Sequence, residues 1–277
     1  MTPAYAFGVN DFGLMDGTVI SGNVIVGTGK SPSEGALGEG IQAVGVNTVI
    51  TGNHVEDCQA EYIELSSTNK TVTNNTIVDK ALLAEAMVVN TNMNTQQNSK
   101  LSYTTIDHNT IYGTLHGIEI YGTYPTAVKI TNNVINNPKV TAVNVINTSS
   151  TWDVTLSGNT FNMSTPSLQA RNAVLTYASP LATTQKVNLT SNIFNYTSGA
   201  NGGAGGETAI SAHTNNMTLV SNTVNGNLVK SKAGAEIIAM NNGGSTYTGY
   251  TFTNNKFMNC LVLITGYVTV SKSGNNF

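Results

Sequence analysis

Glutamate residues recur at matching positions of successive short apolar segments in the first half of the chain. In each segment two apolar residues flank a central residue, whose side chain in a strand points to the opposite face. Gln42, Glu64 and Glu119 are central residues, so we expect them on one outer face. The rest of this expected column is Val88, Asn144, Leu175, Ser211, Ile238 and Val262. A second expected outward column, three residues earlier, contains Glu39, Glu61, Glu85, His116 and Thr141.

Carboxyl groups that project from one face suit the hydrolysis of glycosidic bonds. The reaction uses two carboxyl groups, about 5 Å apart for retention of configuration and about 6.5–9.5 Å apart for inversion. With repeats stacked about 4.8 Å apart, Glu61 and Glu85 would fit the first geometry, and Glu64 and Glu119 the second. Stacked negative charges would raise one pKa, as a general acid requires. We predict these four glutamates as candidate catalytic residues.

Substrate-binding candidates lie beside these carboxylates in the sequence. Tyr62 and Tyr121 are expected on the same outer side, where their rings could stack on sugars. His116 could orient an acid, and Gln42 belongs to the same predicted substrate-binding set. We predict no metal and no cofactor. The alternative interpretation is that a stack of glutamates is only a solvated surface or binds a cation.

A short recurring phrase indicates how this face is built. It consists of an aliphatic residue, two small or polar residues, Asn, any residue, and Ile, Val or Phe, with clear copies from Ile20, Ile50 and Val72. The repeated asparagines are Asn23, Asn53, Asn75, Asn109, Asn133, Asn159, Asn192, Asn222 and Asn255, with Asn275 as an irregular tenth. Their separations of about 20 to 34 residues are typical of solenoid repeats.

Asparagine between two short strands has a structural explanation. A corner there needs a left-handed backbone, which Asn tolerates better than other residues with a Cβ. Stacked Asn side chains can also hydrogen-bond along the axis of a solenoid. We therefore expect the repeated asparagines to support the fold and not to take part in catalysis.

A second apolar strand follows each corner, as in Ile63 with Leu65 and Ile118 with Ile120. No helical period separates the strands, which favours parallel pairing between successive coils, and parallel crossovers are right-handed. The predicted fold class is all-β, a right-handed parallel β-helix of about ten coils with an Asn corner ladder. We expect residues 1–277 to form one such domain, cut from a longer polypeptide, because neither end shows a capping helix.

Composition restricts the partners of the protein. Charged residues make up 10% of the 277 residues, the net charge is −3, and Arg171 is the one arginine. Without a basic patch we expect no nucleic acid partner. No run approaches the ~20 apolar residues of a membrane helix, so we expect no membrane partner, and no secretory signal is visible. Cys58 and Cys260 lie near opposite ends of the chain, and we expect them to be unpaired.

The phrase Ile-Ser-Gly-Asn-x-Ile and its ladder of Asn corners resemble the pectate-lyase-like β-helix superfamily. Within it, the Asn-, Thr- and Gly-rich, Arg-poor composition looks most like the central β-helix of bacteriophage tailspikes. This resemblance implies a homotrimeric, extracellular protein of the virion tail that binds, and usually cleaves, capsular polysaccharide or O-antigen. We expect the particle-binding head and the C-terminal trimerisation part of such tailspikes to lie outside residues 1–277.

Motifs of the enzymatic relatives are largely missing. The Asp-Asp and Gly-His-Gly signatures of polygalacturonases are absent, as is the Tyr-Gly-Val-Asp-Pro-His motif of alginate epimerases. Ile106-Asp107-His108 resembles the Trp-Ile-Asp-His motif of pectate lyases, but Thr105 replaces the Trp and no Arg lies nearby in sequence. We interpret Asp107 and His108 as polar corner residues.

Four hypotheses for function remain open. The first is a tailspike-type glycoside hydrolase that acts on bacterial surface polysaccharide. The second is a non-catalytic adhesin or receptor-binding β-helix, and the third is a polysaccharide lyase. The fourth is a designed or truncated solenoid without a function. Only a lyase leaves an unsaturated sugar, and only a binder leaves the glycan intact.

Overall fold

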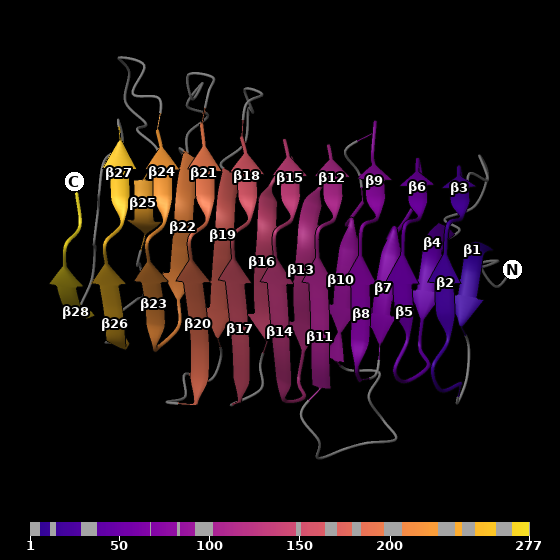
Figure 1. Ribbon diagram of the computed structural model, residues 1–277, viewed down its shortest axis with the longest axis horizontal. Coiled ribbons are helices and arrows are strands. Elements are labelled where there is room, and N and C mark those ends of the chain that lie inside the picture. Colours follow the sequence, from indigo (N-terminus) through magenta and orange to yellow (C-terminus); the bar gives the residue numbers. More distant parts are fainter. Residues whose placement is uncertain are drawn as a thin grey trace, which may run out of the picture.

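The computed structural model is an elongated solenoid whose first and last coils lie at opposite ends (Figure 1). The structure describes residues 6–11, 15–28, 38–66, 68–81, 84–91, 102–147, 151–163, 171–178, 184–196, 207–226, 236–239, 247–258 and 268–276. Strands in these residues pair in parallel within three sheets, which confirms the predicted all-β parallel β-helix. No helix in the described part of the chain is long and apolar enough to cross a membrane.

Three sheets run the length of the solenoid, and each coil adds about one strand to each sheet (Figure 1). The first sheet contains, in spatial order, β1 (Ala6–Asp11), β4 (Gly38–Ala43), β7 (Ile63–Ser66), β10 (Met87–Asn90), β13 (His116–Gly122), β16 (Thr141–Asn147), β19 (Arg171–Ala178), β22 (Glu207–His213) and β25 (Glu236–Ala239). The second sheet contains β2 (Val19–Ser21), β5 (Val49–Thr51), β8 (Lys70–Thr73), β11 (Ser102–Asp107), β14 (Thr126–Thr131), β17 (Trp152–Ser157), β20 (Gln185–Thr190), β23 (Met217–Val220), β26 (Tyr247–Thr253) and β28 (Val268–Ser273). The third sheet contains β3 (Val24–Val26), β6 (His54–Glu56), β9 (Thr76–Val78), β12 (Thr110–Tyr112), β15 (Val134–Asn136), β18 (Thr160–Asn162), β21 (Ile193–Asn195), β24 (Thr223–Asn225) and β27 (Lys256–Met258).

The core is a set of apolar columns inside the solenoid. On each sheet, residues in register in successive coils keep the same inward face, so Ile50 lies over Val72 and Ile118 over Val143. These four side chains are fully buried. On the third sheet, Phe161 and Phe194 stack with ring centroids 4.9 Å apart. Stacked identical positions let each coil bury its apolar face against its neighbours, which one coil alone could not do.

The predicted Asn ladder is present from Asn23 to Asn275. Each ladder residue donates from its backbone N–H and side-chain amide to the Oδ1 of the next, as in Asn133 to Asn159, where both distances are 3.0 Å. The same Asn133 amide also donates to the carbonyl of Ile106 at 2.9 Å. Asn255 continues the ladder to Asn275, which confirms the irregular tenth copy. The buried amides are therefore fully paired, which offsets the cost of burying them.

One detail of the corner is corrected by the structure. The left-handed backbone falls on the residue before each ladder asparagine and not on the asparagine itself. Gly52, Asn74 and Ser191 have φ values of 65°, 56° and 55°. The residue one position earlier is glycine or a polar residue that tolerates this region, namely Asn, Ser or His. The ladder asparagine contributes to the corner through its side-chain amide and not through a left-handed backbone.

Cys58 is buried and is a free thiol, as expected. Burial raises the pKa of this thiol. Cys260 lies outside the described residues.

Candidate active site on the first sheet

Both predicted columns are present on the first sheet. Gln42 is in register with Glu64, Glu64 with Val88, and Val88 with Glu119. Along the earlier column, backbone amides donate to carbonyls of the next coil: Gly40 to Glu61, Tyr62 to Glu85, and Ala86 to His116. Glu39, Glu61, Glu85 and His116 therefore lie in successive coils. We call these residues, together with Glu64 and Glu119, the acidic face.

At the far end of the central column the expected register is wrong by one residue. Ile238 pairs with Ile210, an inward residue, and Ala239 pairs with Ser211. Val262 lies outside the described residues. The acidic face is unaffected, because the register from Gln42 to Ser211 is as expected.

A bend at the start of each strand explains why residues three apart in sequence share the outer face. The amides of Gly40 and Ile41, consecutive in sequence, donate to the carbonyls of Glu61 and Tyr62 at 3.0 and 2.9 Å. Simple alternation would use every second amide for the neighbouring coil, so the alternation is broken there. As a result, Glu61 and Glu64 lie outside the core, whereas the two residues between them face inward.

Tyr62 is one of these inward residues, which corrects its expected outward orientation. Its side chain is fully buried in the hydrophobic core. Burial raises the pKa of its hydroxyl, and the nearby charge of Asp79 adds to the effect. Tyr62 therefore cannot stack on a sugar at the surface. Period-two patterning placed it outside because the sequence carries no clear signal of the bend.

Glu64 is held by two amide side chains. Gln42 Nε2 donates to Glu64 Oε2 at 2.8 Å, and Asn90 Nδ2 donates to Glu64 Oε1 at 3.0 Å. Gln42 in turn accepts a hydrogen bond from Asn10 Nδ2 at 3.2 Å. Glu64 and Gln42 are each only 6% exposed. The structure thus places Gln42 as a support for Glu64, and Asn90 is a partner that the sequence analysis missed.

Glu39 is the most strongly perturbed carboxyl group of the acidic face. Burial, followed by the negative charges of Glu64 and Glu61, raises its pKa from 4.5 to about 8, and a hydrogen bond with Glu64 acts in the same direction. Glu39 is 6% exposed, and its Oε2 has no hydrogen-bond partner. At neutral pH Glu39 therefore keeps its proton beside Glu64. The sequence placed Glu39 in the column but did not single it out.

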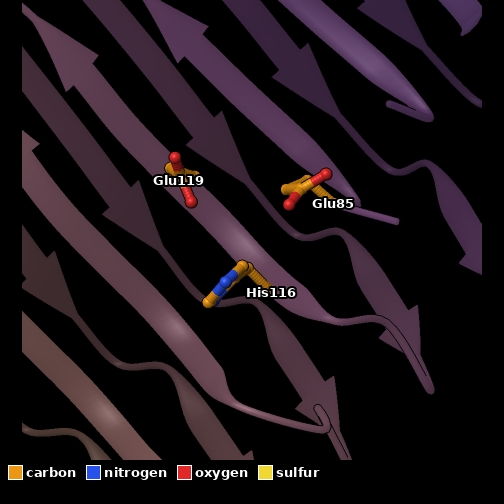
Figure 2. A group of neighbouring side chains, drawn as sticks. All are labelled: Glu85, His116 and Glu119. Atoms are coloured by element: carbon orange, nitrogen blue, oxygen red, sulfur yellow. The ribbon is translucent and has the colours of Figure 1, made fainter. Parts of the chain in front are cut away.

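Glu85, His116 and Glu119 form a second group on the acidic face (Figure 2). One donor atom from each lies within 4.8 Å of the others, and all three side chains are half-buried. Glu85 precedes β10, whereas His116 and Glu119 lie on β13 in the next coil. Burial raises the pKa of Glu85, with a smaller contribution from Glu119. These three residues are the ones that could hold a metal ion.

Glu61 and Tyr121 interact electrostatically both with the Glu39–Glu64 pair and with the group that contains Glu85 and Glu119. Burial raises the pKa of Glu61, and the charges of Glu64, Glu85 and Glu119 contribute. Burial also raises the pKa of Tyr121 to about 12, with contributions from Glu64 and Glu61 among others. Tyr121 is half-buried at the next outward position after Glu119, so its expected place beside the carboxylates agrees with the structure.

Asp107 and His108 occupy a corner between the second and third sheets, away from the acidic face. His108 Nδ1 lies 2.6 Å from Asp107 Oδ2, and His108 has a left-handed φ of 53°. Although burial acts to raise it, the pKa of Asp107 is lowered, because Thr131, His108 and Asn132 hydrogen-bond to the carboxylate. This arrangement is that of a polar corner and supports the interpretation of the sequence.

Two shallow hollows on the second sheet meet at the exposed Tyr103. Their volumes are about 310 and 320 Å³. The second is lined by Lys129, Asp153 and Thr155 among others. Neither hollow contains a residue of the acidic face, so they do not bear on the carboxyl chemistry.

The stacked parallel coils and their Asn ladder define a solenoid protein of the parallel β-helix class. The family model described as right-handed beta helix region matches residues 15–161, and the chain belongs to this family. This match agrees with the right-handed coil expected from the sequence.

A search of solved structures found the catalytic unit of a thermostable GH87 α-1,3-glucanase from Streptomyces thermodiastaticus strain HF3-3. The two share 15% sequence identity with a TM-score of 0.49, over 95% of this chain and 49% of the glucanase chain. The chain thus spans about half the length of that structure. No curated protein matches this chain.

Proposed function

We propose that the acidic face of the first sheet binds a polysaccharide and hydrolyses its glycosidic bonds. The observation that carries the proposal is the pairing of Glu39, whose pKa is raised to about 8, with Glu64, which accepts hydrogen bonds from two amides. Glycoside hydrolysis requires one carboxyl group that carries a proton and one that is ionised. A carboxyl group that keeps its proton at neutral pH, as Glu39 does, is the expected signature of a general acid.

In this mechanism Glu39 donates its proton to the glycosidic oxygen as the bond to the anomeric carbon breaks. Glu64, positioned by Gln42 and Asn90, presents a carboxylate to the positive charge that develops on the sugar. Glu64 then either activates a water molecule or attacks the anomeric carbon. Its separation from Glu39 in the substrate complex decides between inversion and retention. Tyr121 offers a half-buried ring beside this pair on which a sugar could stack.

The substrate class that we propose is bacterial surface polysaccharide, either capsule or O-antigen. Support comes from the resemblance of the corner phrase and the composition to tailspike β-helices. In that setting the chain would be part of a homotrimeric tail protein that acts outside the bacterial cell. A net charge of −3 and a surface rich in Asn and Thr favour recognition through hydrogen bonds over recognition through charge.

A second candidate function, carbohydrate binding without cleavage, is favoured by one observation. Glu39 and Glu64 are each only 6% exposed, which restricts the approach of a polymer to the two carboxyl groups. A binder would use the more exposed rim, which includes Glu61, Glu119 and Tyr121.

The test is incubation of the protein with purified capsular and O-antigen polysaccharides. Glycan size, new reducing ends and ultraviolet absorbance from double bonds would be followed for the wild type, Glu39→Gln and Glu64→Gln. Glu56→Gln is the matched control, because Glu56 pairs with Lys80 and His54 on the third sheet. Saturated products that disappear in Glu39→Gln and Glu64→Gln but not in the control support the hydrolase. Unsaturated products would show a lyase, and binding without cleavage would show the second candidate function.

A further inference from the structure

The group formed by Glu85, His116 and Glu119 has a composition that hydrolysis by Glu39 and Glu64 does not explain. Two carboxylates and one imidazole converge from two neighbouring coils, with donor atoms mutually within 4.8 Å (Figure 2). Glu119 is separated from Glu64 in their column by Val88, so the group lies apart from the proposed acid pair. The bend described above brings His116 and Glu119 to the same outer face, although they are three residues apart on one strand.

Buried polar atoms at this group have no hydrogen-bond partner. Nδ1 of His116 is inaccessible to solvent and unpaired. Asn144, 3% exposed, donates from Nδ2 to Glu119 Oε2 at 3.1 Å, and its Oδ1 is also buried and unpaired. Buried polar atoms are nearly always paired, so unpaired ones beside converging ligands point to a missing partner. An imidazole nitrogen accepts through its lone pair in one of the two tautomers, and an amide oxygen is an acceptor, so a cation is a suitable partner.

We propose that Glu85, His116 and Glu119 bind a divalent transition-metal ion of the Zn²⁺ or Mn²⁺ type. Ca²⁺ and Mg²⁺ prefer oxygen ligands alone, whereas imidazole combined with carboxylates suits Zn²⁺ and other first-row ions. Asn144 orients Glu119 through the hydrogen bond from its Nδ2, as partners of metal-binding carboxylates commonly do. The ion joins two coils and neutralises negative charge on the acidic face. Three protein ligands leave a position open for water or a sugar hydroxyl.

In this proposal Glu85 and Glu119 act as metal ligands, whereas the sequence analysis proposed them as catalytic carboxyl groups. The metal proposal does not depend on the proposed hydrolysis, because metal binding is measured without a glycan. The expected effects fall on metal affinity and thermal stability. Hydrolysis by Glu39 and Glu64 is tested separately.

To test the proposal, the full chain is treated with a chelator, and the chelator is then removed. The metal-free protein is titrated with Zn²⁺, Mn²⁺ and Ca²⁺, and binding is measured by calorimetry. Glu85→Gln, His116→Ala and Glu119→Gln are compared with Glu56→Gln as the matched control, and circular dichroism confirms that each variant is folded. We expect one Zn²⁺ or Mn²⁺ per chain, with affinity reduced at least about 10-fold in each ligand variant and unchanged in the control. Asn144→Ala should weaken binding about 10-fold while leaving the three ligands in place.

Cobalt substitution gives a second readout, because the absorption bands of bound Co²⁺ report nitrogen ligation and should change in His116→Ala. Failure of the folded wild type to bind Zn²⁺ or Mn²⁺ at one ion per chain would overturn the proposal. So would binding that is unchanged in all three ligand variants, or binding of Ca²⁺ in preference to both transition-metal ions.

Discussion

The side-chain amide of Gln42 donates a hydrogen bond of 2.8 Å to Oε2 of Glu64, which lies in the next coil of the first sheet. Asn90 reaches the other oxygen of the same carboxylate from the following coil at 3.0 Å. Glu64 is therefore fixed from both sides by groups that cannot titrate. Gln42 is in register with Glu64, whereas Asn90 is in register with Ser66, two residues further along β7, and reaches Glu64 diagonally from the next coil.

Removing the hydrogen bond from Gln42 to Glu64 should reduce the rate of catalysis more than the binding of substrate. Gln42→Ala frees one oxygen of Glu64, and we expect kcat on a cleaved polysaccharide to fall about 10- to 100-fold, because misplaced reacting groups carry costs of this size. KM should change little. Asn188→Ala is the control, since Asn188 donates to Asp153 on the second sheet. Equal losses in the two variants would mean that Gln42 acts on general stability alone.

Glu39 should make the protein less stable as pH rises. The unfolded chain releases this proton near pH 4.5 and the folded chain near pH 8, so the folded state binds more protons between these values. The contribution of Glu39 to the free energy of unfolding should therefore be largest below pH 4.5 and fall until about pH 8. Lys70, whose pKa burial lowers to about 8, alters stability only above this window.

Glu39→Gln mimics the protonated group and should remove most of this slope. We expect the variant to exceed the wild type by roughly 2 kcal/mol or more at pH 8 and to match it near pH 4, since one pKa unit corresponds to about 1.4 kcal/mol. Urea unfolding at both pH values measures this. The slope that remains should reflect Glu61, whose pKa is also raised. Parallel pH profiles for the two proteins would contradict the assignment.

Asn133 provides a test of the ladder. Its amide bonds to Asn159 and Ile106, and its Oδ1 accepts from the backbone and side chain of Asn109. Asn133→Ala leaves several buried groups unpaired, so we expect a loss of about 2–4 kcal/mol in the free energy of unfolding. Asn132→Gly changes the exposed neighbour, whose φ of 54° suits glycine, and should cost clearly less, because it removes one exposed hydrogen bond to Asp107. Similar losses in both variants, measured by urea unfolding, would exclude the ladder as the source of stability.

Tyr62 and Tyr121 should respond to mutation in opposite ways. Tyr62→Ala removes a fully buried ring and should cost about 3–5 kcal/mol of stability, whereas Tyr62→Phe should leave glycan binding unchanged. Tyr121→Ala should weaken glycan binding with a small effect on stability, because its ring is half-buried beside the acidic face. Thermal unfolding and affinity electrophoresis separate the two effects. Loss of glycan binding in a folded Tyr62→Phe protein would be inconsistent with the inward position of Tyr62.

Residue patterns predict much of this fold because a solenoid repeats its geometry. The Asn phrase located the corners from Asn23 to Asn275, and the apolar pairs gave the register of Gln42, Glu64 and Glu119. Both depend on local period and recurrence, which a single sequence displays directly. The stacking of the acidic-face residues in successive coils could therefore be predicted from the sequence.

The errors arise where the chain departs from regular alternation or where contacts cross between coils. The bend before β7 turned Tyr62 inward, and the left-handed φ fell one residue before each ladder asparagine. The raised pKa of Glu39 depends on its burial and on charges in the neighbouring coil. Neither the depth of a side chain nor the angle at which one coil meets the next is encoded in a local pattern.

The most direct test of the acid pair is a nuclear magnetic resonance titration of the side-chain carboxyl carbons of glutamate. The wild type and Glu39→Gln would be compared from pH 3 to pH 10. We predict one carboxyl group that titrates near pH 8 in the wild type and is missing from the spectrum of Glu39→Gln. A wild-type protein whose glutamates all titrate below about pH 5 would lack the protonated acid and would contradict the proposed mechanism.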